Sequence, residues 1–277
     1  MSEAPLVSIG LPVRNGAATI AAALESLVAQ DHPNIEIIVS DNASTDDTVA
    51  IVAAFALRDP RIRLVRQPRN IRMMANFHAV AAAARGDFFM WAAADDTRSA
   101  DYARRLLAGY VHSPEAVCVH GDTDELFPDG SVRRHAPAFV TMGLGPAVRL
   151  RRIAAGQSFF LYGLWRTPIA RALPMRELYW WPDLPPMLAA AALGSFAHHP
   201  GPVFRYTFHP RPFFRDPVAA TTALPKLAWG CFTAVRQVGG LRLGFLAGWL
   251  GAARMAAQIR DFAVVRLGLK KGYVADG

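Results

Sequence analysis

The chain has 277 residues and a formal net charge of +8 at pH 7, which favours anionic partners such as nucleotides, phosphorylated substrates or acidic lipid. No basic stripe with interleaved aromatic residues is present, so the sequence argues against nucleic acid as a partner. Cys118 and Cys231 have neither disulfide-framework nor zinc spacing, and the N-terminus lacks the charged and apolar regions of a signal peptide. We therefore expect reduced thiols and a cytoplasmic protein.

From residue 6 to residue 119, short apolar runs alternate with amphipathic stretches. The expected strands are 6–11, 35–40, 61–66 and 87–92, and the expected helices are 19–30, 46–57, 73–84 and one that starts near Ser99. Strands separated by helices of this length form a parallel sheet with right-handed crossovers. The sequence therefore predicts an α/β fold with a mostly parallel sheet flanked by helices.

After residue 119 the pattern changes. Residues 120–215 hold Gly, Pro and many aromatic side chains, with a turn at Pro128–Gly130, and such a region can build a shaped pocket. We expect helices with glycine interruptions over 222–269. The run Leu243–Ala253 is apolar, too short to span a bilayer, and bracketed by arginines. It can lie in a membrane interface, pack on the rest of the protein or contact another subunit.

Two adjacent carboxylates, Asp95 and Asp96, follow directly on the apolar run that begins at Asp87. Ionised carboxylates at the end of a buried strand are unfavourable unless a positive charge meets them. Ligands of open α/β sheets bind at the carboxyl ends of the strands, so a divalent cation that carries a phosphorylated substrate explains the pair. The alternative is that one carboxylate caps the helix expected near Ser99.

Two further loops stand at expected strand ends. Asp41 and Asn42 follow the second strand, where their side chains can receive a base or a ribose hydroxyl. A helix cap and an Asx turn account for Ser44–Asp46 without any function, but account for Asp41 less well. Pro12–Gly16 forms a tight loop after the first strand. The glycine motifs of dinucleotide and P-loop sites are absent.

Taken in order, four segments resemble the nucleotide-binding half of inverting family 2 glycosyltransferases: PLVSIGLPVRNG, IEIIVSDNASTDDT, NIRMMAN and RGDFFMWAAADD. The segments FLYGLWRTP, WPDLPPMLAAAALGSF and VFRYTFHP resemble the acceptor half of that family, so the resemblance covers about residues 5–212. It implies a GT-A fold in which 1–119 binds the nucleotide sugar and 120–215 binds the acceptor and carries the catalytic base. Residues 216–277 then form a helical segment.

The resemblance also implies roles for single residues. Asp41 matches the residue that recognises the base, and Asp183 matches the general base. Asp95 and Asp96 match the acidic motif that binds Mg²⁺ or Mn²⁺, with Asp96 the direct ligand. The remaining nucleotide-site residues are Pro12, Val13, Asn15, Asn42, Asn70 and Asn76. Arg205 and His209 match a late segment that closes over the diphosphate or assists the metal, and Arg72 stands where the family commonly has a small residue.

These roles predict a metal-dependent glycosyltransferase that moves a sugar from a UDP-, dTDP- or GDP-linked donor to an acceptor hydroxyl. The acceptor is a saccharide or a lipid-linked saccharide, as in bacterial polysaccharide or glycoconjugate synthesis, and peripheral contact with the inner face of the membrane is compatible with it. A base opposite the leaving group gives single displacement with inversion. Asp183 can also cap the helix expected over Leu184–Ala192. The alternatives are a catalytically silent protein with this fold and a sugar-nucleotide nucleotidyltransferase.

Overall fold

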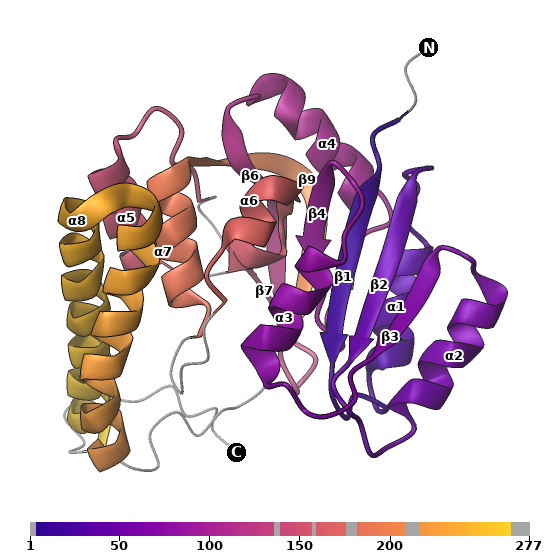
Figure 1. Cartoon of the computed structure of the whole chain (residues 1–277), viewed down its shortest axis with the longest axis horizontal. Coiled ribbons are helices and arrows are strands. Elements are labelled where there is room, and N and C mark those ends of the chain that lie inside the picture. Colours follow the sequence, from indigo (N-terminus) through magenta and orange to yellow (C-terminus); the bar gives the residue numbers. More distant parts are fainter. Residues whose placement is uncertain (1–3, 136–138, 157–158, 176–181, 209–216, 267–277) are drawn as a thin grey trace.

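A nine-stranded sheet forms the centre of the protein, with strand order β3-β2-β1-β4-β8-β6-β9-β5 and β7 paired to β6. The computed structural model describes residues 4–135, 139–156, 159–175, 182–208 and 217–266 (Figure 1). The strands are β1 (Val7–Val13), β2 (Ile35–Asp41), β3 (Ile62–Arg66), β4 (Phe88–Trp91), β5 (Thr97–Arg98), β6 (Ala116–Leu126), β7 (Val132–His135), β8 (Leu164–Arg166) and β9 (Ser195–Thr207). The helices are α1 (Ile20–Val28), α2 (Thr48–Arg58), α3 (Met73–Ala82), α4 (Tyr102–His112), α5 (Pro146–Ala155), α6 (Thr167–Ala172), α7 (Leu184–Leu193) and α8 (Pro217–Arg266), with a 3-10 turn at Phe159–Tyr162.

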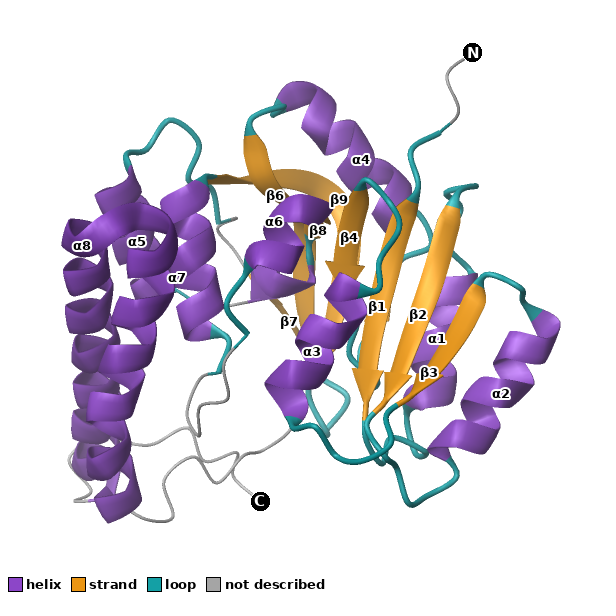
Figure 2. Ribbon diagram, in the orientation of Figure 1, coloured by secondary structure: helices purple, strands orange, loops and turns teal. Residues whose placement is uncertain are grey.

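The first four strands confirm the predicted parallel sheet, since β1 pairs in parallel with both β2 and β4, and β2 pairs in parallel with β3 (Figure 2). Every residue of β1 is buried, because helices cover both faces of the sheet. Leu24 of α1 and Leu106 of α4 pack in one hydrophobic cluster, and Val80 of α3 and Trp91 of β4 pack in the other. Burial of this kind supplies most of the free energy that holds helices on a sheet.

The second half of the chain extends the same sheet. β6 runs through residue 119 to Leu126 and is paired in parallel with β9, while β8 joins it to β4. The predicted turn at Pro128–Gly130 connects β6 to β7, and Gly130 has a φ of 81°. On the outer side, α5, α7 and α8 pack together as a helical layer (Figure 1).

The helix predicted to start near Ser99 begins instead at Tyr102. Thr97 and Arg98 form the short strand β5, which pairs with β9, and the Ser99 hydroxyl accepts a hydrogen bond from the main-chain N–H of Val203 at 3.0 Å. The prediction was wrong because pairing with a distant strand outweighs the local tendency to start a helix. Neither carboxylate of the Asp95–Asp96 pair is therefore placed to cap this helix, whose N-cap position is Asp101.

Candidate active site at the strand ends

The carboxyl ends of β1, β2 and β4 meet at one edge of the sheet and surround a cavity of about 620 Å³. This volume is within the usual range for small-ligand sites. Its lining residues are Pro12, Val13, Arg14, Asn15, Gly16, Thr19, Asn42, Asn70, Arg72, Met73, Asn76, Phe77, Ala93, Ala94, Asp95 and Tyr162. Seven of the residues predicted from the sequence therefore lie at one site: Pro12, Val13, Asn15, Asn42, Asn70, Asn76 and Asp95.

The loops after β1 and β2 are joined by reciprocal hydrogen bonds. The main-chain N–H of Asn15 donates to the Ser44 hydroxyl at 2.9 Å, and the N–H of Thr45 donates to Asn15 Oδ1 at 2.9 Å. The N–H of Gly16 donates to the Thr48 hydroxyl at 2.8 Å. Asn15 has a φ of 53°, a conformation that Asn tolerates better than most residues. The amide of Asn15 thus holds the two loops together as well as lining the cavity.

Asp41 ends β2 opposite Val13 and is 1% exposed. Its Oδ2 accepts a hydrogen bond from the N–H of Ser44 at 3.1 Å. Its Oδ1 is buried without a hydrogen-bond partner among the described residues. A buried carboxylate oxygen without a partner is unfavourable, so this atom is suited to receive an N–H group from a ligand.

The three asparagines predicted for the nucleotide site also hold the cavity wall in place. Asn42 Oδ1 accepts from the N–H of Ile71 at 2.8 Å, and Asn42 Nδ2 donates to Asn70 Oδ1 at 3.1 Å. Asn76 Nδ2 donates to the Ser40 carbonyl at 2.8 Å, and the Ser40 hydroxyl donates to Asn76 Oδ1 at 2.6 Å. These contacts fix the start of α3 against the end of β2.

Arg72, just before α3, has a φ of 73° and a ψ of 163°, a conformation that is nearly restricted to glycine. Two hydrogen bonds hold it: its N–H donates to Asn70 Oδ1 at 2.8 Å and its carbonyl accepts from Asn42 Nδ2 at 3.2 Å. Strain of this kind is typical of functional sites, and here it places an arginine in the wall of the cavity.

We expect Arg72→Gly to raise the free energy of unfolding by about 1 kcal/mol. Relief of about 1–3 kcal/mol of backbone strain exceeds the entropy that glycine loses on folding, about 0.5–1 kcal/mol. Urea denaturation measures the change, with Arg69→Gly as the matched control, because Arg69 is an exposed arginine of the same loop whose φ is not positive. An Arg72→Gly variant that is destabilised as much as the control would contradict this expectation.

The acidic pair divides between the cavity and the protein interior. Asp95 lines the cavity, whereas Asp96 is 1% exposed and accepts a hydrogen bond at Oδ1 from the N–H of Thr207 at 2.8 Å. The Thr207 hydroxyl donates to the Asp95 carbonyl at 2.5 Å, so the end of β9 clasps the pair. Burial, followed by the charge of Asp95, raises the pKa of Asp96 to about 7.

Arg98 is a buried positive charge that acts on Asp96. Its guanidinium donates to the Trp91 carbonyl and stacks over the rings of Tyr102 and Phe204, at 5.7 and 5.3 Å. Its Nε and Nη1 are buried without hydrogen-bond partners in the described part of the chain. The charge of Arg98 lowers the pKa of Asp96, but burial and the charge of Asp95 raise it by more.

Tyr162 is a residue of this site that the sequence alone did not indicate. Its ring stacks on Phe204 at 4.9 Å and forms part of the cavity wall. Burial raises the pKa of its hydroxyl well above the usual value, and the charges of Asp96, Asp95 and Asp183 act in the same direction. The predicted metal-binding pair and the predicted base therefore lie within electrostatic range of one tyrosine.

Asp183 occupies the N-cap position of α7, but its side chain makes no capping hydrogen bond. The Asp183 carboxylate therefore accepts no hydrogen bond from the first-turn N–H groups of α7. Because α7 is almost entirely buried, that helix gives Asp183 a rigid support. His209, predicted to contact the metal or the diphosphate, lies outside the described residues.

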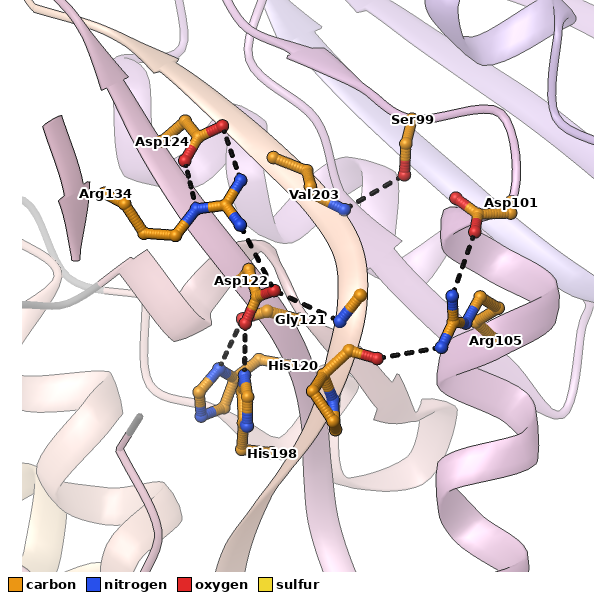
Figure 3. Close-up of polar contacts among 12 residues, drawn as sticks. Ser99, Asp101, Arg105, His120, Gly121, Asp122, Asp124, Arg134, His198 and Val203 are labelled. Carbon is orange, nitrogen blue, oxygen red and sulfur yellow. Dashed lines mark hydrogen bonds and ion pairs between the residues drawn. The ribbon is translucent and has the colours of Figure 1, made fainter. Parts of the chain in front are cut away.

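Arg205 lies on β9, paired with Thr97 on one side and Asp124 on the other, and is not among the residues that line the cavity. The pKa of the Asp124 carboxyl is lowered, mainly by the hydrogen bond from Arg134 at 2.7 Å and also by the charge of Arg205. Figure 3 shows Asp124 and Arg134 beside Asp122, whose Oδ1 accepts a hydrogen bond from His198 at 2.8 Å. We interpret this cluster as structural, because each carboxylate in it is bonded to a basic side chain of a neighbouring strand: Asp124 to Arg134 and Asp122 to His198.

The donor set at the strand ends fits a divalent cation. Two adjacent carboxylates provide hard oxygen ligands, and burial, followed by the charge of Asp95, makes ionisation of Asp96 unfavourable without a cation. No group of three or more His, Cys, Asp or Glu side chains that would hold a metal occurs in the described ranges. Any further ligands would therefore come from a bound substrate, water or residues such as His209.

Together, the parallel sheet, the cavity at its strand ends and the acidic pair define a GT-A type fold. The chain belongs to glycosyl transferase family 2, whose family model matches residues 8–167. It is 32% identical over 152 residues to succinoglycan biosynthesis protein ExoO of Rhizobium meliloti, covering 50% of this chain and 43% of that protein. It is 33% identical over 107 residues to the putative glycosyltransferase EpsE of Bacillus subtilis, covering 38% and 37%. The chain thus spans less than half the length of these curated relatives.

Solved structures show the same fold at low sequence identity. TarS 1-349 of S. aureus in complex with UDP-GlcNAc has a TM-score of 0.67 and 16% identity, covering 96% of this chain and 76% of that one. The mannosyltransferase PcManGT of Pyrobaculum calidifontis, in complex with GDP-Man and Mn²⁺, has a TM-score of 0.58 and 16% identity, covering 98% and 82%. These similarities confirm the GT-A fold predicted from the sequence.

Proposed function

We propose that this protein is an inverting glycosyltransferase that moves a sugar from a nucleotide-diphosphate donor to an acceptor hydroxyl. The observation that carries the proposal is the cavity at the strand ends, which is lined by Asp95 and by Asn42. Asn42 directly follows Asp41, whose buried Oδ1 has no hydrogen-bond partner among the described residues. One end suits a nucleobase and the other suits a diphosphate with its cation. Membership of glycosyl transferase family 2 supports the reaction class.

The donor carries uracil, thymine or guanine in this proposal. Each of these bases has a ring N–H that can donate to Asp41 Oδ1, whereas cytosine has none at the equivalent position. The family relationship makes UDP-, dTDP- and GDP-sugars the candidates, and the structurally similar proteins named above were solved with UDP-GlcNAc and GDP-Man. Arg14 and Arg72 add positive charge to the cavity wall, which favours an anionic ligand.

Asp95 and Asp96 would hold Mg²⁺ or Mn²⁺, which when bound neutralises charge that develops on the diphosphate leaving group. The protein's own part is to present the two carboxylates: the Thr207 N–H holds the Asp96 carboxylate, and the Thr207 hydroxyl holds the main-chain carbonyl of Asp95. Arg205, although it does not line the cavity, and His209 remain predicted contacts of the diphosphate or the metal. Arg98 limits the repulsion between the carboxylates from the buried side.

Asp183 is the proposed general base. Its carboxylate makes no capping hydrogen bond to α7. Its charge acts on the hydroxyl of Tyr162, which lines the cavity. As the acceptor hydroxyl attacks the anomeric carbon, Asp183 takes its proton while the diphosphate leaves from the opposite face. A single displacement of this kind inverts the configuration at that carbon. The acceptor is a saccharide or a lipid-linked saccharide, and ExoO supports a role in polysaccharide synthesis.

Calorimetry with UDP, dTDP, GDP and CDP, each with and without Mn²⁺, tests the donor site. We expect one of the first three to bind, more tightly with Mn²⁺, and CDP to be the matched nucleotide that does not. Asp41→Asn should weaken that binding about 10- to 100-fold, because one charge-assisted hydrogen bond to the base is lost. Equal binding of CDP would contradict the base contact assigned to Asp41. No binding of any nucleotide would contradict the proposal and favour a catalytically silent protein.

A further inference from the structure

The outer surface of α8 carries an exposed aromatic face, which we define as Trp229, Phe232, Leu241, Phe245 and Trp249. Four of these side chains are highly exposed: Trp229 at 64%, Leu241 at 59%, Phe245 at 68% and Trp249 at 65%. In the described part of the chain, all exposed Trp and Phe side chains belong to this face. A concentration of large apolar groups on one surface marks an interaction site.

The face is contiguous because α8 folds back on itself. Gly240 has a φ of 78°, which breaks the helix into two arms. On the second arm, Gly248 lies against the Ala228 carbonyl of the first arm, so a Cβ there would stand 3.1 Å from that oxygen. Gly248 thus lies on the side of the second arm that packs against the first arm, whereas Phe245 and Trp249 lie on its exposed side. Phe232 bridges the arms, with its ring 5.3 Å from Trp229 and 5.0 Å from Phe245.

The charged side chains of α8 up to residue 260 have one sign. Lys226, Arg236 and Arg242 are exposed on α8, and the sequence from Pro217 to Arg260 contains no Asp or Glu. A second copy of the chain docked face to face would bring these cations toward one another. An anionic surface would instead be attracted to them, and Trp and Phe side chains flanked by Lys and Arg are typical of helices that lie in a membrane interface.

We propose that the aromatic face of α8 binds the interface of an anionic phospholipid bilayer. The proposed contact is a peripheral one, and no described helix is long and apolar enough to cross a membrane. The helix is firmly joined to the rest of the protein: Arg254 donates to the Ala154 carbonyl at 2.8 Å, and Leu250 and Met255 pack in the core. Binding through α8 therefore brings the whole protein to the bilayer.

Flotation of the full chain with vesicles tests this proposal. We expect binding to vesicles of mixed phosphatidylcholine and phosphatidylglycerol to exceed binding to pure phosphatidylcholine by about tenfold or more, and to fall at high salt. The triple variant Trp229→Ser, Phe245→Ser, Trp249→Ser should lose this binding. Because its side chains are exposed, the fold should survive, which circular dichroism and the calorimetric nucleotide titration check.

The matched control is the double variant Leu57→Ser, Val111→Ser, which removes exposed apolar side chains elsewhere, at 89% and 78% exposure. It should bind vesicles like the wild type. Tryptophan emission should shift to the blue with anionic vesicles, and Trp229→Phe with Trp249→Phe should reduce that shift. The proposal would be overturned if the wild type did not bind anionic vesicles, or if the triple variant still bound them. A wild type that is a dimer in solution, with a triple variant that is a monomer, would also overturn it, since a second copy of the chain would then cover the face.

Discussion

Asp183→Asn is expected to lower the rate of sugar transfer by about 10²- to 10⁴-fold, the usual effect of losing a general base. The amide cannot take the acceptor proton, but it has the same shape and stands at the same position before α7. Nucleotide affinity should therefore stay within about twofold of the wild type, because Asp183 faces the acceptor in the proposed mechanism. Single-turnover transfer from the donor identified by calorimetry, beside a binding titration, measures both quantities.

The matched control is Asp101→Asn, since Asp101 occupies the N-cap position of α4 as Asp183 does for α7. If Asp183 had only a structural role at a helix start, the two variants would both lose a little stability and keep their transfer rate. A wild-type rate in Asp183→Asn would remove the base assignment while leaving the donor site intact. The stereochemistry of the product, read by NMR at the anomeric carbon, tests the proposed inversion independently.

Asp96→Asn is expected to stabilise the protein at pH 8 while abolishing metal-dependent nucleotide binding. The pKa of Asp96 rises from an ordinary value of 3.8 to about 7 in the folded protein. The folded state thus holds this proton more tightly than the unfolded chain, so stability falls as the pH rises from about 4 to about 7. Asparagine does not ionise and escapes this loss, which corresponds to at most about 4 kcal/mol.

Urea denaturation of the wild type and Asp96→Asn across pH 4 to 8 measures this difference, which should grow with pH and vanish near pH 4. Mn²⁺ should stabilise the wild type at pH 8 and leave the variant unchanged, because it favours the ionised carboxylate. Asp95→Asn is the companion variant: it should also lose the response to Mn²⁺ and, by removing a like charge, stabilise the protein. A variant less stable than the wild type at every pH would contradict the raised pKa.

The first half of the fold was predictable because its signals are local. Apolar runs such as Ile35–Asp41 and helices such as α1 are specified by their own residues, and the structure reproduces their bounds within about two residues. The short strand at Thr97 was not predictable, because its partner β9 is far along the chain. β6 was not among the predicted strands either, and in its second half Gly121 and its acidic neighbours show no apolar alternation.

The candidate site divides in the same way. Asp41 and Asp95 could be identified because each lies within three residues after a predicted strand, which puts both at one edge of the sheet. Tyr162 and Arg98 could not, since their roles depend on long-range packing against Phe204 of β9. The aromatic composition around Tyr162 was the only signal available, and it marks a pocket without indicating which ring faces the acidic pair.

The hydrogen bonds between Asn15 and the loop that holds Ser44 and Thr45 also limit how this cavity can evolve. Loss of the Ser44 hydroxyl or of the Asn15 side-chain amide removes a hydrogen bond to the other loop, so we expect changes at these two positions to be coupled. Arg14 and Arg72 line the same cavity without taking part, through their side chains, in that exchange. Within a lineage, we expect donor preference to diverge through these two arginines first, while the interlocked residues change slowly and together.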